Sequence, residues 1–492
     1  MDLSPTEIRT VVIGAMLALF LAALDQTVVA TALPSIAKDL GGFALISWIV
    51  TAYLLTATCV TPLVGKLSDL YGRRVVLRIC LGVFILGSVL CALAPSMILL
   101  ILARAVQGVG GGGLMTMAQT IIGDVVSPRE RGRYAGYFSI VWGSSSVLGP
   151  TIGGVVTDQI GWPWIFWINL PLGLLALVIS DHALRKLPVA GRRSTLEFAG
   201  IVLLCAATIA LLLIFSLGGH RLAWGSPQIL ILAVAALALA ASFVWQQRQS
   251  PEPIFPSRFF RDGVTAPVLA SIFVVYGSYL AVAVLAPSYF QVALGSSVSE
   301  AGLLMIPFML SSTLTANLAG QYSRRSGRYK PPPLIGLPVA ALSLAVLPLI
   351  AERLSAFGIA MVLMVTGLGL GPIFPCTTVA AQNAVERRDL GAITGAVGFA
   401  RALGGAVGVG AATALVLGLA SNLLTHAGHI ASLEDLARRH LPPAARADAA
   451  TAFEFMFAAT AFMLLLAWAL FLKVEHRPLS HRTASAPAPE MD

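Results

Sequence analysis

The sequence predicts an all-α polytopic membrane protein with fourteen transmembrane helices, built as two related six-helix bundles with two extra central helices. Composition, a series of apolar runs and an internal repeat carry this prediction. Hydrophobic residues make up 57% of the 492 residues and charged residues only 11%, whereas about 25% of a typical soluble domain is charged. A chain with so few charged residues lacks the polar side chains needed to cover a water-facing surface. This composition excludes the soluble globular class.

Fourteen apolar runs follow one another along the chain, each near the length of about 20 residues that a helix needs to cross a bilayer. Loops rich in Arg, Gly or Pro separate them. The runs cover residues 10–33, 45–65, 75–94, 97–121, 134–157, 164–184, 198–217, 227–246, 264–287, 300–320, 332–350, 357–380, 392–418 and 449–472. Because their number is even, we expect both chain ends on the same side of the membrane.

The Lys and Arg residues set the expected orientation of these spans. The formal net charge is +9, and most basic residues fall in loops on the side of the chain ends. The opposite side has only Lys38, Arg221, Arg353, Arg438, Arg439 and Arg446. By the positive-inside rule we expect cytoplasmic termini and a multi-pass protein of the inner (plasma) membrane. No basic patch is interleaved with aromatic residues, so nucleic acid is not expected as a partner.

An internal repeat relates the first six runs to the last six. Shifts of 255 and 259 residues superpose glycines of the two halves in the same order. The matched pairs include Gly65 with Gly320, Gly72 with Gly327, Gly108 with Gly367, Gly110 with Gly369, Gly112 with Gly371 and Gly149 with Gly408. The repeat predicts an N-terminal bundle over 1–184, inserted helices with linkers over 185–263, a C-terminal bundle over 264–472 and a disordered cytoplasmic tail over 473–492. Duplicated halves are typical of transporters that alternate access.

Asp25 places a carboxylate deep inside the first apolar run. A charge at the centre of a membrane helix costs about 2.5 to 3.5 kcal/mol on insertion scales. Asp124, Asp158 and Glu454 lie near or just beyond the ends of such runs. We interpret Asp25 as a proton site; a position near a helix end, or a partner with only a packing role, is the alternative.

Residue types that hold metals or perform covalent catalysis form no pattern here. The five cysteines lie in apolar runs without CxxC spacing, which indicates neither a disulfide framework nor a metal site. HExxH and GxSxG motifs are absent. We therefore expect no enzyme activity, no metal and no cofactor apart from the proton as coupling ion. A membrane-embedded enzyme and a transport-fold sensor are the alternatives from other classes.

The segment Gly65–Arg74, GKLSDLYGRR, is the most informative local pattern. Its glycines allow a close approach and a tight turn in a short loop, its aspartate offers a charge to a helix N-terminus or an arginine, and its two arginines hold the loop on the cytoplasmic side. A plain turn with positive charges is the alternative. The segment resembles the loop between the second and third helices of the major facilitator superfamily.

Four more segments extend the resemblance over essentially the whole chain. They are LDQTVVATALP at Leu24–Pro34, RAVQGVGGGG at Arg104–Gly113, VLGPTIGG at Val147–Gly154 and WPWIFWINLPLG at Trp162–Gly173. With the fourteen runs, they resemble the fourteen-helix drug:proton antiporters of the superfamily. The resemblance implies the major facilitator fold and multidrug efflux, a function linked to antibiotic resistance, and it leaves the substrate open.

The resemblance also assigns roles to individual residues. Asp25 and Arg104 would handle protons or substrate inside the membrane. A cytoplasmic latch that favours the outward-open state would consist of Gly65, Asp69, Gly72, Arg73 and Arg74. The antiporter motif of the fifth helix would consist of Gly149, Pro150, Gly153 and Gly154. A structural role for Arg104, and simple close packing for the glycines, are the alternatives.

A cavity between the halves is expected to be lined by Gln107, Met115, Tyr137, Phe138, Tyr276 and Arg401, although aromatic and Met residues in spans often only pack. Two departures from the repeat indicate that the halves do not duplicate their charges. Arg324 stands where Asp69 stands in the first half, and Arg401 falls on Trp142. Arg401 either faces the cavity or snorkels at the inner end of its span.

The expected function is proton-coupled export of hydrophobic or cationic small molecules by alternating access. A monomer in the lipid bilayer would exchange its substrate for protons at Asp25. Import by proton symport is the alternative within the transporter class. One proton exchanged for one monovalent cation moves no net charge, so the pH gradient alone would drive that cycle, unless a second proton site such as Asp124 or Glu454 takes part.

Overall fold

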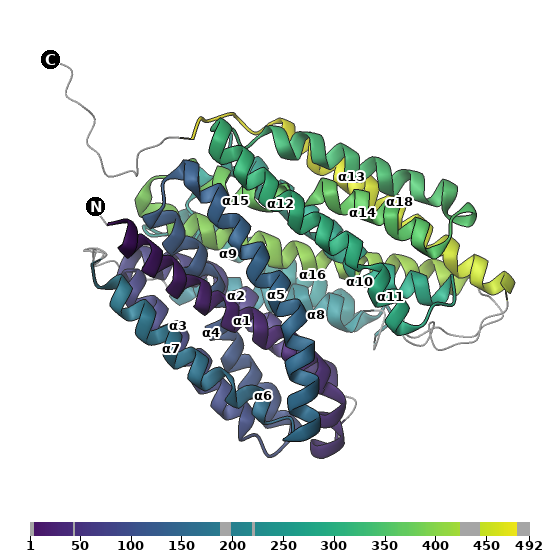
Figure 1. Cartoon of the computed structure of the whole chain (residues 1–492), viewed down its shortest axis with the longest axis horizontal. Coiled ribbons are helices and arrows are strands. Elements are labelled where there is room, and N and C mark those ends of the chain that lie inside the picture. Colours follow the sequence, from purple (N-terminus) through teal and green to yellow (C-terminus); the bar gives the residue numbers. More distant parts are fainter. Residues whose placement is uncertain (1–3, 43–44, 187–197, 219–221, 424–442, 480–492) are drawn as a thin grey trace.

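The computed structural model describes residues 4–42, 45–186, 198–218, 222–423 and 443–479. Within these ranges, fourteen helices are long and apolar enough to cross a membrane. They form two bundles that lie against each other, with the first and last described residues, Ser4 and Leu479, on one side, here called the terminus side (Figure 1). These findings confirm the predicted fold class. Most of the tail predicted to be disordered, residues 480–492, lies outside the described ranges, as does residue range 187–197 of the predicted linker.

The first bundle is built around a glycine-rich helix. Its elements are α1 (Pro5–Leu40), α2 (Ile46–Tyr71), α3 (Arg73–Ala92), α4 (Met97–Val125), α5 (Pro128–Gln159), α6 (Trp164–Trp167), α7 (Asn169–Ala183) and the short η2 (Leu184–Lys186). α4 packs closely on α2 and α3. A Cβ atom at Gly112 would lie 2.3 Å from the carbonyl oxygen of Ala57, and one at Gly110 would lie 2.5 Å from the backbone nitrogen of Phe84. Small residues let membrane helices approach this closely.

The two inserted helices cover the junction between the bundles. They are α8 (Phe198–Leu217) and α9 (Pro227–Gln249), followed by η3 (Ser257–Phe260). α8 packs on α9 and also contacts α2 of the first bundle and α16 of the second. Leu63, Leu204, Phe243 and Ile254 form a small apolar cluster at this junction.

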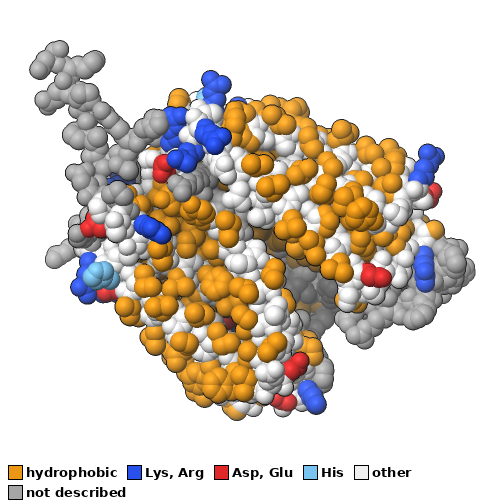
Figure 2. Space-filling model, in the orientation of Figure 1, with side chains coloured by type: hydrophobic (Ala, Val, Ile, Leu, Met, Phe, Trp, Pro, Cys, Tyr) orange, Lys and Arg blue, Asp and Glu red, His pale blue; other side chains and the backbone are white. Residues whose placement is uncertain are grey.

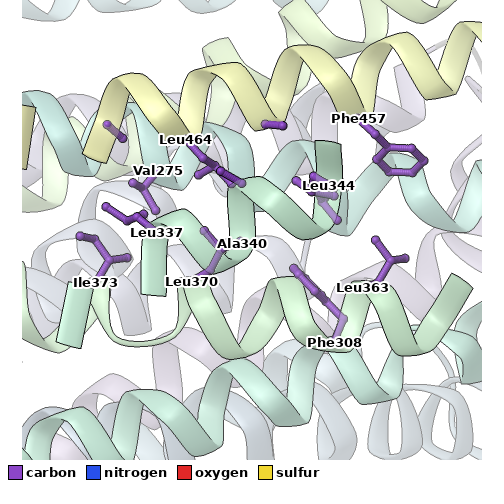
Figure 3. Close-up of a cluster of buried hydrophobic side chains, with 14 of the residues drawn as sticks. Val275, Phe308, Leu337, Ala340, Leu344, Leu363, Leu370, Ile373, Phe457 and Leu464 are labelled. Carbon is purple, nitrogen blue, oxygen red and sulfur yellow. The ribbon is translucent and has the colours of Figure 1, made fainter. Parts of the chain in front are cut away.

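The second bundle has the larger continuous core. Its elements are α10 (Thr265–Val292), α11 (Val298–Leu304), α12 (Ile306–Ser326), α13 (Pro331–Ile350), η4 (Ala351–Arg353), α14 (Ala356–Leu370), α15 (Ile373–Asn383), η5 (Arg387–Asp389), α16 (Leu390–Leu423) and α18 (Pro443–Leu472). Leu337, Leu344, Leu363, Leu370 and Leu464 belong to one core cluster drawn from α13, α14 and α18 (Figure 3).

The structure corrects two kinds of boundary. Three predicted spans are interrupted by one or two residues, between α6 and α7, α11 and α12, and α14 and α15; Pro372 stands at the last of these breaks, where proline cannot continue the helical hydrogen bonds. The predicted loop over Gly65–Arg74 is also wrong. α2 continues to Tyr71 and α3 starts at Arg73, so the chain reverses at Gly72, whose φ of 88° suits glycine.

The two bundles touch on the terminus side and separate on the other. α16 contacts α2, and α12 contacts α5. A Cβ atom at Gly65 would lie 2.3 Å from the carbonyl oxygen of Gly391, so the backbones of α2 and α16 meet directly. Figure 2 shows the surface hollowed between the bundles on the side opposite the terminus side; this is called the central hollow below.

Candidate functional site

A closed polar network holds Asp25 inside the first bundle. Its Oδ2 accepts a hydrogen bond from Arg104 Nη1 at 2.6 Å, and its Oδ1 accepts from Gln107 Nε2 and Asn169 Nδ2, each at 2.8 Å. The same two amides donate to Ser88 Oγ, at 3.2 Å and 2.9 Å respectively. Asp25 is 2% exposed. Its three donors, one of them charged, offset the cost of burying the carboxylate.

Arg104 is enclosed as completely as Asp25. Its guanidinium also donates to Gln107 Oε1 at 2.7 Å, its Nε donates to the carbonyl oxygen of Ile49 at 3.4 Å, and its Cζ lies 4.3 Å from the centre of the Tyr53 ring. Removing the charge of one partner from a buried ion pair costs about 3 to 5 kcal/mol, because the other charge is left uncompensated. Neutralising Asp25 would therefore destabilise this arrangement of the first bundle, because the charge of Arg104 would stay buried without a counter-charge.

The network draws only on helices of the first bundle, within the part of the chain that the structure describes. Asp25 lies on α1, Ser88 on α3, Arg104 and Gln107 on α4, and Asn169 at the start of α7. Gln107, which was expected to line a cavity, is instead fully buried. Sequence reasoning missed Ser88 and Asn169. The signal for Asn169 was its place as a lone amide in the apolar segment WPWIFWINLPLG.

A second polar cluster ties the two bundles together on the terminus side. Asp69 on α2 accepts hydrogen bonds from the backbone nitrogens of Gly391 and Ala392, at 2.9 and 2.7 Å. These N–H groups open α16, and a helix N-terminus favours a negative charge. Arg73 Nη1 lies 2.6 Å from Asp69, and Arg73 Nε donates to Asp124 at 2.6 Å. From here on the name latch is kept for the residues that make these contacts, which are Asp69, Arg73, Asp124, Gly391 and Ala392.

Arg74, expected in the latch, lies outside it. It donates to both carboxylate oxygens of Asp181 on α7, at 2.9 and 3.0 Å. In the second bundle, the counterpart of Asp69 also has a different place: Arg324 pairs with Glu130 at 3.2 Å, and its side chain is 46% exposed. The latch is thus formed by the first copy of the repeated segment and not by the second.

The glycines of the fifth span bring α5 against α1. A Cβ atom at Gly149 would lie 2.0 Å from Thr27 Oγ1, and one at Gly153 would lie 2.3 Å from Thr31 Oγ1. Gly154 has no such neighbour within 4 Å, and Pro150 is exposed within α5. Two glycines of this motif therefore have a packing role that Gly154 lacks.

Arg401 lies on α16 beside aromatic side chains. Its Nη2 donates to Thr378 Oγ1 at 3.3 Å, and its Cζ lies 5.8 Å from the centre of the Tyr276 ring. Its Nε is buried without a hydrogen-bond partner. Of the other residues expected to line a cavity, Met115 and Phe138 pack against the core of the first bundle, and Tyr137 stacks edge-on with Tyr134 at 5.6 Å.

Comparison with known proteins identifies the family. The family model described as Major Facilitator Superfamily matches residues 15–409. This chain belongs to the major facilitator superfamily. Multidrug transporter protein MdtP of Bacillus subtilis (strain 168) is 38% identical over 426 residues, which cover 85% of this chain and 77% of MdtP. Multidrug resistance protein 3 of the same organism is 32% identical over 401 residues, which cover 82% and 78% of the two chains.

Solved structures of the superfamily show the same fold. The proton:xylose symporter XylE matches with a TM-score of 0.64 and 15% identity, over 97% of this chain and 98% of that one. The resemblance seen in the sequence motifs is confirmed. This major facilitator protein is a multi-pass membrane transporter with relatives named for multidrug transport and resistance.

Proposed function

We propose that this major facilitator protein is a proton-coupled antiporter that exports hydrophobic small molecules across the plasma membrane by alternating access. The observation that carries the proposal is the Asp25–Arg104 pair, in which both side chains are 1% exposed within a membrane-spanning bundle. Ionisable groups buried at such depth are typical of proton pathways. The names of the two Bacillus relatives favour export of small molecules.

Proton uptake at Asp25 would be coupled to movement through Arg104. Once Asp25 is neutral, the guanidinium keeps its amide, carbonyl and aromatic neighbours but loses its counter-charge. A buried, unpaired cation is unfavourable. Any rearrangement that hydrates Arg104 or gives it a new partner therefore lowers the free energy of the bundle. Release of the proton restores the closed network. The proton thus biases an equilibrium between two packings of the first bundle.

The latch would supply the alternation. With the termini in the cytoplasm, as the positive-inside rule indicates, the closed terminus side and the central hollow together correspond to an outward-open state. Asp69 holds α2 against the start of α16 in this state. Rocking one bundle against the other would break these two hydrogen bonds, close the hollow and open the cytoplasmic side.

Asp25→Asn tests the proposal in inside-out vesicles with an imposed pH gradient and a panel of hydrophobic dyes. We expect gradient-driven accumulation to fall at least about tenfold, because the site can no longer exchange a proton. Exchange of dye against dye without a gradient should persist, since that half-cycle needs no protonation. Asp158→Asn, which alters an exposed carboxylate of α5, serves as the matched control. Full gradient-driven accumulation by the Asp25 variant would contradict the proposal.

A further inference from the structure

Arg401 lies one helical turn beyond the contact between the bundles. Along α16, a Cβ atom at Gly391 would lie 2.2 Å from the carbonyl oxygen of Gly65, and one at Gly398 would lie 2.8 Å from Thr61 Cγ2 on α2. The next glycine, Gly404, contacts Phe273 of α10 in its own bundle instead. Arg401 stands between these positions and is partly exposed. Arg401 is therefore placed on α16 close to the point where the two bundles part.

The charge of Arg401 is not neutralised by any carboxylate of the described residues. Its described polar neighbours are the Thr378 hydroxyl and the face of Tyr276, and its Nε has no hydrogen-bond partner. Asp25, the acid of the first bundle, is already paired with Arg104. The second bundle thus has an uncompensated positive charge near the point where the bundles part, and Asp25 supplies no free negative charge. Such a site favours an anion and repels a cation.

An aromatic wall adjoins the guanidinium. The Tyr276 and Tyr279 rings stack with centres 6.1 Å apart, Tyr279 stacks on Phe308 at 5.3 Å, and Phe374 meets Tyr279 edge-on at 5.2 Å. The four rings come from α10, α12 and α15. Tyr276, Tyr279 and Phe374 are partly exposed, while Phe308 is buried behind them. A flat apolar molecule finds stacking partners beside a cation here.

We propose that Arg401, held by Thr378, and this aromatic wall bind the exported substrate, and that the substrate is an aromatic or amphipathic molecule with an anionic group of the carboxylate or sulfonate class. The inference rests on the proposed export function and specifies the substrate of that transporter. The guanidinium pairs with the anionic group, its free Nε–H adds a hydrogen bond, and the rings cover the apolar body. Thr378 holds the guanidinium in place: its hydroxyl donates to the carbonyl oxygen of Phe374 at 3.1 Å and accepts from Arg401. It replaces the cationic substrates that the sequence alone led us to expect.

The charge moved in each cycle follows from this assignment. One proton entering while one monovalent anion leaves moves two positive charges inward. An interior-negative membrane potential therefore drives this exchange, whereas exchange of a proton for a monovalent cation moves no net charge. Export of the anion should rise with membrane potential at constant pH gradient.

The test uses three probes that share a pyrenebutyl body and have an anionic, a neutral or a cationic head group: pyrenebutyrate, pyrenebutanol and pyrenebutyltrimethylammonium. Their binding to the full chain in lipid nanodiscs is measured by fluorescence anisotropy against empty nanodiscs. We expect the parent protein to bind the butyrate most tightly, and Arg401→Gln to weaken the butyrate about 10- to 100-fold while the alcohol changes less than about twofold. Arg353→Gln removes an exposed arginine of η4 and should leave all three affinities unchanged.

Two further variants keep the test decisive if Arg401→Gln unfolds. Arg401→Lys should retain the preference for the anion, and Arg401→Glu should reverse it toward the cation. Equal losses for all three probes, or a parent protein that prefers the cation, would overturn the inference. Transport in inside-out vesicles separates the two proposals. Gradient-driven export of the cation at the same rate in the parent and in Arg401→Gln rejects this inference alone. Anion binding that depends on Arg401, without gradient-driven transport, rejects the antiport function alone.

Discussion

The two bundles share a scaffold but differ in how they hold charge. In the first bundle, Asp25 and Arg104 neutralise each other within a network that excludes solvent. In the second, Arg401 is partly exposed and has a hydroxyl group and an aromatic ring as its described neighbours. The first arrangement suits a proton that biases packing, and the second suits the charge of a ligand. Under the two proposals above, single residue differences between the repeated halves would assign proton coupling to the first bundle and substrate binding to the second.

The backbone contacts, by contrast, are shared. In the first bundle, Gly149 brings α5 against α1; in the second, its counterpart Gly408 brings α16 against α10, where a Cβ atom would lie 2.3 Å from the Cα of Gly277. The two bundles therefore share this close helix contact, whereas their buried charged residues differ. The following variants test this comparison, beginning with the largest expected effect.

Gly149→Val and Gly408→Val should both prevent stable folding. The added side chain would meet Thr27 in one bundle and the backbone of Gly277 in the other, and overpacking of this kind costs about 1 to 3 kcal/mol or more. Yield of monodisperse protein and thermal unfolding in mild detergent are the measurements. Gly154→Val is the control, because a Cβ atom at that position meets no atom within 4 Å. If only one of the two variants fails, the bundles do not share this contact.

Asp69→Asn should reduce transport at least about tenfold, because each charge-assisted hydrogen bond to the start of α16 contributes about 1.5 to 3 kcal/mol. Its counterpart variant Arg324→Gln removes an exposed pair with Glu130, and pairs of that kind contribute about 0 to 1 kcal/mol. We expect less than about a twofold change in transport for it. Initial rates in vesicles measure both variants. Equal losses would show that both copies of the segment act as latches.

The fold class and the charged residues of the latch could be predicted from the sequence, but the partners of Asp69 could not. Composition and apolar runs predict the fold class, because an all-helical arrangement satisfies the hydrogen bonds of backbone groups within a bilayer. Asp25, Arg104 and Asp69 are visible as charges in unusual places. The N–H groups of Gly391 and Ala392, which Asp69 binds, belong to the backbone of a distant helix start, so no side-chain pattern reveals them.

The polar partners of Asp25 and the breaks in the spans were harder to predict. Ser88 and Asn169 are ordinary polar residues in apolar runs, and their spacing shows no periodicity that points to Asp25. Single residues such as Ile168 and Met305 separate helices that the hydropathy pattern joins. The open charge of Arg401 was foreseen as a departure from the repeat, but its aromatic neighbours come from three helices and required the structure.

The smallest expected effect on stability concerns the N-terminal cap of the first helix of each bundle, α1 in the first and α10 in the second. Asp262 caps α10: its Oδ1 accepts from the backbone nitrogens of Val264 and Thr265 at 2.9 and 3.0 Å, and its Oδ2 accepts from Arg477 at 2.7 Å. Partial burial raises the pKa of Asp262, but these hydrogen bonds and the Arg477 charge outweigh it and leave the pKa below its usual value. The resulting stabilisation is present above the unfolded pKa of about 3.9 and is lost as the pH falls through the folded value.

Asp262→Asn keeps an oxygen for the cap but removes the charge that Arg477 meets. We expect the variant to unfold at a lower temperature at pH 7, by a margin that corresponds to about 1 kcal/mol or less. This difference should shrink as the pH falls below about 3.9 and should vanish once the pH lies below the folded pKa of Asp262. Its counterpart Glu7 closes a capping box with Ser4 at the exposed start of α1, so Glu7→Gln should change stability by less than about 0.5 kcal/mol at pH 7. A stability difference for Asp262→Asn that persists at low pH would mean that the shape of the cap, and not its charge, distinguishes the two bundles here.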